Sequence, residues 1–451
     1  MSRWHFAPEH ALVSGRGLLS TWARGAAHTL TEVRGNPTPA AVAAEGFMTR
    51  FGFGMVSLAL PLFALSLGMS LAEVGLLYAL RTAATIAIKP VMGWAADRYG
   101  RKTTLVLAIV LRCLVGLLFV FASQAWHLYA LRILQGAMTA ARDPSAAALL
   151  ASHGKRNSMA STFAWYTTAR DVGRSLGYGA AGLLIEFSGG YHAVFLIAFL
   201  TSCAALVTVL KFVAENPAWG DKAPARRAAP PVAARPGNGG ASWRSSWAMY
   251  GRLMPYAGFG LMVASSAEMM QGLFPVLATQ YARLTEGQAG LAVSASSVAV
   301  LIAGPLFGWL SDHVSRKLAL GARSAANTLS SVLYIVAPTF GGYMAAKVVD
   351  DSGKAAFRPT WGAMLAEVSE VDPSRRAQTM TFVDSAYTLG EVVGPIAAGT
   401  LLALVGFPGM LAARAVLALA TEAHSIWMFR RSGSRFSSPA AVVAVEPAAA
   451  A

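Results

Sequence analysis

The chain has 451 residues, of which 55% are hydrophobic and only 13% are charged, and its mean hydropathy is +0.49. Soluble domains carry roughly 25% charged residues, so the composition excludes an ordinary soluble protein and favours membrane spans. Only Cys113 and Cys203 occur, both within apolar runs, and we expect neither a disulfide framework nor a metal site from them.

Residues 1–40 contain scattered arginines but no compact apolar core with a small-residue cleavage site, so no secretory signal is expected. Apolar residues from Leu12 to Val33 recur at helical spacing. They predict a cytoplasmic N-terminal segment, 1–44, that forms an amphipathic helix at the membrane surface. The alternative is a loosely ordered tail.

About twelve apolar segments follow, each near the ~20 residues that cross the hydrocarbon of a bilayer. They divide into a first half, 45–213, and a second half, 251–431, with six predicted spans in each. The segment 214–250 is rich in Pro, Ala, Gly and Arg and predicts a flexible basic linker. The Ala-rich tail 432–451 is predicted to be disordered and cytoplasmic. The predicted spans are 46–67, 71–96, 103–123, 127–151, 158–185, 191–213, 251–280, 289–311, 318–338, 342–368, 378–404 and 409–429.

The net charge of +15 is unevenly distributed over the loops. Loops on one side of the membrane hold nearly all the basic residues, whereas the other side holds only Arg283. By the positive-inside rule, both termini and the basic loops are cytoplasmic, in a bacterial-type inner membrane. The charge is therefore a topology signal, and we expect no nucleic-acid partner. The basic side comprises both tails, the linker, Arg98, Arg101, Lys102, Lys155, Arg156, Arg316, Lys317, Arg375 and Arg376.

A loop sequence occurs twice, once in each half. Residues 93–102 read GWAADRYGRK, and residues 308–317 read GWLSDHVSRK. Both copies end an apolar run with Gly-Trp, contain an Asp, and close with a basic pair. A repeat of this length, separated by about half the chain, indicates a membrane protein built by duplication.

These features resemble the major facilitator superfamily of secondary transporters. The first loop copy meets the family pattern G-x-x-x-D-R-x-G-R-[RK] at every fixed position, whereas the second departs at His313 and Ser315. The resemblance implies an all-α integral membrane protein with twelve transmembrane helices in two pseudo-symmetric six-helix bundles. A second family pattern, L-x-x-x-R-x-x-Q-G-x-x-x-A, is present as Leu128, Arg132, Gln135, Gly136 and Ala140.

The repeated loop is predicted to be a conformational latch between the halves. Asp97 can face the N-terminal end of a helix from the other half, where unpaired amides favour an anion, and Gly100 permits a tight turn. The alternative is a basic loop that only sets topology. The predicted latch residues are Gly93, Asp97, Arg98, Gly100, Arg101, Lys102, Asp312, Arg316, Lys317 and Glu367.

Many ionisable residues lie inside the predicted spans, where each costs about 2.5–3.5 kcal/mol on insertion scales. We expect them to face a wet central path and to bind the solute or a proton. The alternative is structural ion pairs between spans, in particular Arg142–Asp143 and Asp171–Arg174. The candidates are Arg132, Gln135, Asp143, Arg170, Arg174, Glu268, Lys347, Asp351, Lys354, Arg358, Asp384 and Glu391.

Glu268 is the strongest candidate for a proton carrier. It has no basic neighbour within a helical turn, and Ser265, Ser266 and Gln271 make its surroundings polar. Poor solvation favours the neutral form of a carboxyl group, which suits reversible protonation. A solute ligand and a hydrogen-bonded structural carboxyl are the alternatives, and Asp384 and Glu391 are the next candidates.

The expected function is secondary active transport of a small polar or charged solute by alternating access, coupled to protons. A proton-coupled multidrug or amphiphile efflux antiporter is the alternative, although the span-five pattern of drug exporters lacks its proline here and occurs in span eleven at Pro395. A scaffold or sensor that does not transport is the third hypothesis. No nucleotide-binding loop or zinc spacing occurs, so we expect no enzyme, no cofactor and no metal. The expected partners are the solute, protons and membrane lipids, and the expected state is a monomer.

Overall fold

The computed structural model describes residues 37–153, 159–213, 243–313, 316–369 and 376–432. Within these ranges the regular elements are helices, and no strand occurs. The predicted N-terminal amphipathic helix and the disordered tail lie outside the described residues, as does most of the predicted linker.

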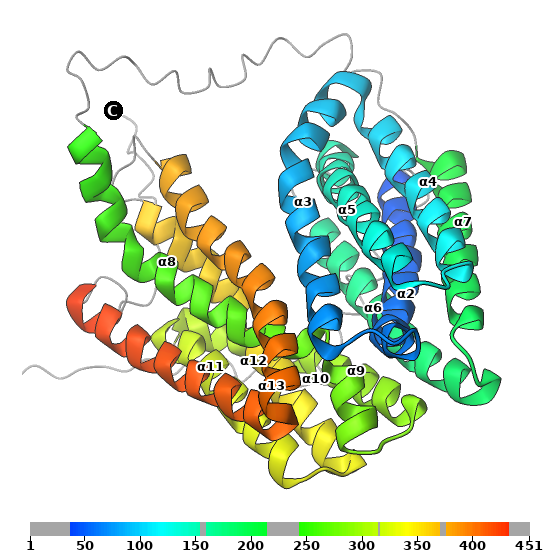
Figure 1. Cartoon of the computed structure of the whole chain (residues 1–451). Helices are drawn as coiled ribbons and strands as arrows, with labels where there is room; N and C mark the ends of the chain where they lie inside the picture. The colour runs from blue at the N-terminus through cyan, green and yellow to red at the C-terminus, as the bar shows by residue number, and fades with distance from the viewer. Residues whose placement is uncertain (1–36, 154–158, 214–242, 314–315, 370–375, 433–451) are drawn as a thin grey trace, which may run out of the picture.

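The described helices form two bundles of six membrane spans, as predicted (Figure 1). The last helix comprises two spans, because Gly406 breaks it with a φ of 69°. The first bundle comprises α2 (Pro37–Ser66), α3 (Leu71–Tyr99), α4 (Arg101–Val120), α5 (Ala125–His153), α6 (Met159–Ser188) and α7 (His192–Phe212). The second comprises α8 (Trp243–Gln271) with the short α9 (Phe274–Val276) and η2 (Leu277–Tyr281), then α10 (Glu286–His313), α11 (Arg316–Val336), α12 (Phe340–Ser369) and α13 (Arg376–Ser432).

Two helices begin well before the apolar segments that predict them. α2 begins at Pro37, and α8 begins at Trp243, inside the segment assigned to the linker. The reason is physical: hydropathy marks only the residues that suit hydrocarbon, whereas a helix that satisfies its own backbone hydrogen bonds can continue beyond the apolar layer.

Five described helical segments are by themselves long and apolar enough to cross a membrane, and a bent pair, Leu253–Gln271 with Phe274–Tyr281, makes a sixth. One of the five, Gln378–Arg430, contains the two spans of α13. The helices α5, α6 and α12 are less apolar because they carry the charged residues described below.

Glycines with positive φ mark the turns and define two ends of the molecule. Gly100 has a φ of 92° and joins α3 to α4. We name that side the Gly100 end. Gly189, with a φ of 68°, follows α6 at the opposite side, which we name the Gly189 end. Gly68, between α2 and α3, and Gly406, between the two spans of α13, also lie at the Gly189 end.

The repeat predicted from the sequence is visible in the packing of matched glycines. In the first bundle, Gly173 and Gly177 of α6 pack against the backbone carbonyls of α2. In the second bundle, Gly390 and Gly394 of α13 pack against the backbone carbonyls of α8. A larger side chain at any of these positions would collide with backbone, so the small residues allow the same close helix contact in both halves.

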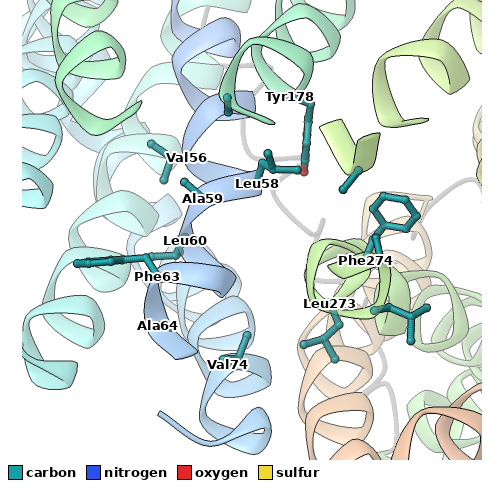
Figure 2. Packing of buried hydrophobic residues seen from close by; sticks show 14 of the residues in the cluster. Val56, Leu58, Ala59, Leu60, Phe63, Ala64, Val74, Tyr178, Leu273 and Phe274 are labelled. Carbon is teal, nitrogen blue, oxygen red and sulfur yellow. The ribbon is translucent and has the colours of Figure 1, made fainter. Parts of the chain in front are cut away.

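The apolar core is shared at one end and divided at the other. One cluster combines residues of both bundles, including Leu58, Phe63 and Tyr178 of the first and Leu273 and Phe274 of the second (Figure 2). Two further clusters each belong to a single bundle: residues 41–213 supply one and residues 253–429 the other. The bundles therefore form one body at the Gly189 end and separate bodies toward the Gly100 end.

Direct contacts between the bundles agree with this arrangement. Ser294 of α10 donates its hydroxyl to the carbonyl of Ser175 in α6 at 2.7 Å, and Ser175 donates to the carbonyl of Ser294 at 3.0 Å. A side chain at Gly75 of α3 would collide with the carbonyl of Pro395 in α13. The structure is thus closed at the Gly189 end, and the two bundles diverge toward the Gly100 end (Figure 1).

Candidate transport pathway

A pocket lies between the bundles, next to their shared core. Residues of α2, α3 and α6 form one wall, and residues of α8 and α13 form the other. The first wall supplies aromatic rings and two guanidinium groups, whereas the second supplies two carboxyl groups and an amide. The lining residues are Phe53, Ser57, Tyr78, Arg81, Thr82, Arg174, Tyr178, Glu268, Gln271, Glu391 and Pro395.

Three of the predicted path residues, Arg174, Glu268 and Glu391, meet in this pocket. Glu268 is half-buried. Its helix, α8, packs closely against α13 at Gly394, where a side chain would collide with the backbone of α8. No hydrogen bond or ion pair to its carboxyl group is found among the described residues. Its own helix has no basic residue nearby, but Arg81 and Arg174 of the opposite bundle line the same pocket.

Arg132 and Gln135 lie behind the pocket wall, in α5. Arg132 is 2% exposed; its Nε donates to the carbonyl of Leu77 at 2.9 Å and its Nη1 to Oε1 of Gln135 at 2.8 Å. The guanidinium also lies 4.5 Å from the ring centroid of Tyr78, which lines the pocket. Arg132 and Gln135 therefore support the pocket wall through Tyr78 and do not line the pocket themselves.

An ion network in the first bundle joins α2, α5 and α6. Arg142 holds the buried Glu45 through two hydrogen bonds, of 2.8 Å and 2.6 Å, and contacts Asp143 at 2.7 Å. Asp143 also forms ion pairs with Arg170 at 3.4 Å and with Arg50 at 3.8 Å. We call these residues the first-bundle network. Its bidentate Arg–carboxylate geometry ties spans of one bundle together.

The second bundle contains a more deeply buried network around Asp350. Its carboxylate contacts Arg414 of α13 at 2.6 Å, Arg323 of α11 at 3.2 Å and Lys354 at 3.3 Å. Arg414 and Asp350 are fully buried. Arg414 additionally donates to the amide oxygen of Asn327 at 2.9 Å. We call this group, with Lys347 and Asp351, the second-bundle network.

Three of the predicted path residues, Lys347, Asp351 and Lys354 of α12, lie together in this network. Asp351 accepts from Lys347 at 2.8 Å and from Lys354 at 3.0 Å. It also accepts from the hydroxyl of Ser296 in α10 at 2.7 Å. These side chains are paired within their own bundle, which is the arrangement of structural ion pairs.

The remaining predicted residues lie outside the pocket and the two networks, or have side chains that are not described. The side chain of Asp384 is exposed. The ion pair expected between Asp171 and Arg174 is present, at 3.9 Å. Among the latch residues, Arg98 is exposed and its guanidinium lies 5.6 Å from the ring of Trp94. Lys102 is half-buried. The side chains that lie outside the described ones are those of Asp97, Arg101, Asp312, Arg316, Lys317, Arg358 and Glu367.

Sequence reasoning missed several charged residues that the structure places at central positions. Arg81, Arg323 and Arg414 each stand in an apolar stretch without an acidic partner on the same helical face. Glu45 lies before the predicted first span. One feature of the sequence could have identified them. Placing a lone cation in an apolar span costs free energy, so when its own helix supplies no acidic or polar neighbour, another helix is expected to supply one.

Comparison with known proteins identifies the family. The family model of the Major Facilitator Superfamily matches residues 45–282 and 256–443. The multidrug resistance protein MdtG of a Rahnella species is 23% identical over 405 residues, which covers 85% of this chain and 92% of that protein. The multi-drug resistance efflux pump PmrA homologue of Lactococcus lactis is 30% identical over 174 residues, 38% of this chain and 42% of the pump.

Solved structures of transporters share the fold. The nucleoside transporter NupG superposes with a TM-score of 0.70 at 13% identity, covering 86% of this chain and 98% of that one. A bacterial homologue of the human lysosomal transporter Spinster, in an inward-facing and occupied conformation, superposes with a TM-score of 0.67 at 14% identity, covering 89% of this chain and 98% of that one. With its family match in both halves and its two six-span bundles, this integral membrane protein belongs to the Major Facilitator Superfamily of transporters.

Proposed function

We propose that this protein is a proton-coupled secondary transporter that moves a small polar or charged organic solute by alternating access. The observation that carries the proposal is the pocket in which Glu268 and Glu391 of one bundle face Arg81 and Arg174 of the other. A solute in this pocket contacts both bundles. Rocking of the bundles would therefore change both its access and its partners.

The position of the pocket supports alternating access. It adjoins the shared core near the closed Gly189 end, while the bundles diverge toward the Gly100 end. Because the described basic residues Arg98 and Lys102 lie at the Gly100 end, the positive-inside rule assigns that end to the cytoplasm. The conformation is then the inward-open one, and opening the other side requires the Ser175–Ser294 contact to break.

Glu268 is the group best suited to carry the proton. A carboxyl group that lacks a fixed ion-pair partner loses little when it is neutralised, whereas a paired one such as Asp350 leaves buried cations unbalanced. In the proposed cycle, Glu268 binds a proton from one side and releases it to the other as the bundles rock. Gln271, one turn away, keeps the site polar in either state.

The test is Glu268→Gln in the full-length protein reconstituted into liposomes, with a solute first found by its stabilisation of the purified protein. The variant should still exchange solute across the membrane but should fail to accumulate it under a proton gradient. The matched control is Glu422→Gln, since Glu422 is another half-buried carboxyl inside a span and does not line the pocket. If Glu268→Gln drives uphill transport at the normal rate, Glu268 is not the proton carrier.

Efflux of amphiphilic drugs is the second candidate. It is favoured by the names of the relatives and by the aromatic rings of Phe53, Tyr78 and Tyr178 in the pocket. Cells that produce the protein should then retain less of a fluorescent cationic dye such as ethidium than cells that produce the Glu268→Gln variant. Equal retention would argue against drug efflux.

A further inference from the structure

Two guanidinium groups at or next to the pocket form no ion pair with a carboxylate among the described residues. Arg132 is almost fully buried, and its ordered contacts are the carbonyl of Leu77, the amide of Gln135 and the ring of Tyr78. Its Nη2 has no hydrogen-bond partner. Arg81, which lines the pocket, lies 5.5 Å from the ring centroid of Phe53, and its buried Nε also has no partner.

These two cations are held close together by helix packing. Gly136 of α5 lies against the backbone carbonyl of Arg81 in α3, and Thr85 donates its hydroxyl to the carbonyl of Gly136 at 3.2 Å. Arg132 lies about one turn from Gly136 on the same helix. Like charges at such sites repel each other in a medium of low dielectric, so an anionic group close to both guanidinium groups is stabilised.

A third cation faces the same space from α6. Arg174 lines the pocket, and its ion pair with the half-exposed Asp171 is long, at 3.9 Å. Ion pairs with such exposure contribute little. The wall formed by α2, α3 and α6, backed by Arg132 of α5, thus presents guanidinium N–H donors in excess of the acceptors that the same wall supplies.

We infer that this wall binds the oxyanion of the transported solute, a carboxylate, sulfonate or phosphate group, through Arg81 and Arg174, with Arg132 contributing charge from behind Tyr78. The planar fork of a guanidinium matches the paired oxygens of such groups. The aromatic rings of Tyr78 and Tyr178 suit an apolar body next to the anionic group. The inference rests on the proposed function, because it names the substrate class of the same pocket.

The opposite wall then acquires a defined role. Arg81 and Arg174 balance Glu268 and Glu391 in charge before the solute binds. When one anionic group and one proton enter together, the net charge of the lining and its contents is unchanged, and no extra charge is placed in the membrane interior. The oxyanion and the proton are therefore bound in the same state of the transporter.

The test measures binding to the purified full-length protein in detergent, by thermal stabilisation and calorimetry, with small probes that share one ring. The probes are benzoate, benzenesulfonate and phenyl phosphate as anions, benzylamine as a cation, and benzyl alcohol as a neutral compound. Chloride, sulfate and inorganic phosphate are measured separately. We expect an anionic ring compound to stabilise the protein, and the cationic and neutral compounds to leave it unchanged.

Arg81→Gln should weaken binding of the anionic probe by about tenfold or more, since a hydrogen bond to a charged group contributes about 1.5–3 kcal/mol. Arg81→Lys should recover part of the loss. Arg283→Gln removes the same charge at an exposed turn outside the pocket and serves as the control. Retention of ring-anion binding in Arg81→Gln would overturn the assignment.

Other outcomes separate this inference from the proposed function. If benzylamine alone binds and Glu268→Gln abolishes its binding, the oxyanion site is wrong while a charged solute remains supported. If inorganic anions bind through Arg81 but no ring anion does, the wall is an inorganic-anion site and the inferred solute class is wrong. Uphill transport in the Glu268→Gln liposomes tests the coupling independently of either result.

Discussion

Charges inside the two bundles and charges in the pocket between them are arranged in opposite ways. Each ion pair between described residues of the two networks joins partners of the same bundle, at distances as short as 2.6 Å for Glu45–Arg142 and for Asp350–Arg414. In the pocket, by contrast, carboxyl groups from α8 and α13 face guanidinium groups from α3 and α6.

We propose that this difference separates structural from functional charge. A pair within one bundle keeps its geometry when the bundles rock, because both partners move together. A charge that faces the other bundle changes its surroundings during every transition, and a bound solute or proton can take part in that change. Buried charge by itself is therefore weak evidence for a transport path, and the proposed path rests on charges of the two bundles that line one pocket.

The most disruptive test of this distinction is Asp350→Asn. Arg323, Lys354 and Arg414 would lose their shared carboxylate, and removing one partner of a buried pair costs about 3–5 kcal/mol. We expect a large drop in the unfolding temperature of the purified protein, measured by dye fluorescence or scattering in detergent. Asp384→Asn, at an exposed carboxylate of α13, should change it little. An Asp350→Asn protein as stable as the wild type would remove Asp350 from a structural role.

Glu45→Gln should have an intermediate effect. Arg142 would lose its bidentate partner but would keep Asp143 at 2.7 Å, so the buried cation stays partly neutralised. We expect a loss of about 1.5–3 kcal/mol, the range for a hydrogen bond to a charged group, seen as a smaller shift in unfolding temperature than that of Asp350→Asn. If Glu45→Gln were the more damaging of the two, the first-bundle network would depend less on Asp143 than its geometry indicates.

Asp97→Asn should affect stability least. Asp97 lies in the last turn of α3, before Gly100, and the sequence predicts it near the cytoplasmic surface, where a substitution changes stability by less than about 0.5 kcal/mol. If the repeated loop is a latch, the variant should nevertheless lose most transport and shift the balance between inward-open and outward-open forms. Thiol labelling of cysteines introduced on each face reads this balance. Unchanged labelling on both faces would leave the loop with a topological role only.

Most of the architecture could be predicted from the sequence, whereas the partners of the charges could not. Apolar runs of membrane length located the spans, and the duplicated loop revealed the two halves. The i, i+4 and i, i+3 spacing of Lys347, Asp351 and Lys354 also predicted their clustering, because those residues share a helix. Glu45 and Arg142, however, are partners across two helices, and no local spacing connects them.

By itself, then, the sequence determined what the bilayer requires: helices with internally satisfied backbones, their number, their order and the glycines that let them approach closely. Tertiary structure alone decided which buried charges neutralise one another, which end of the molecule is closed, and that Glu268 faces Arg81 and Arg174. The physical reason is the sequence separation of the interacting residues. Hydropathy is a property of each segment, whereas an ion pair between helices depends on the packing of segments far apart in the chain.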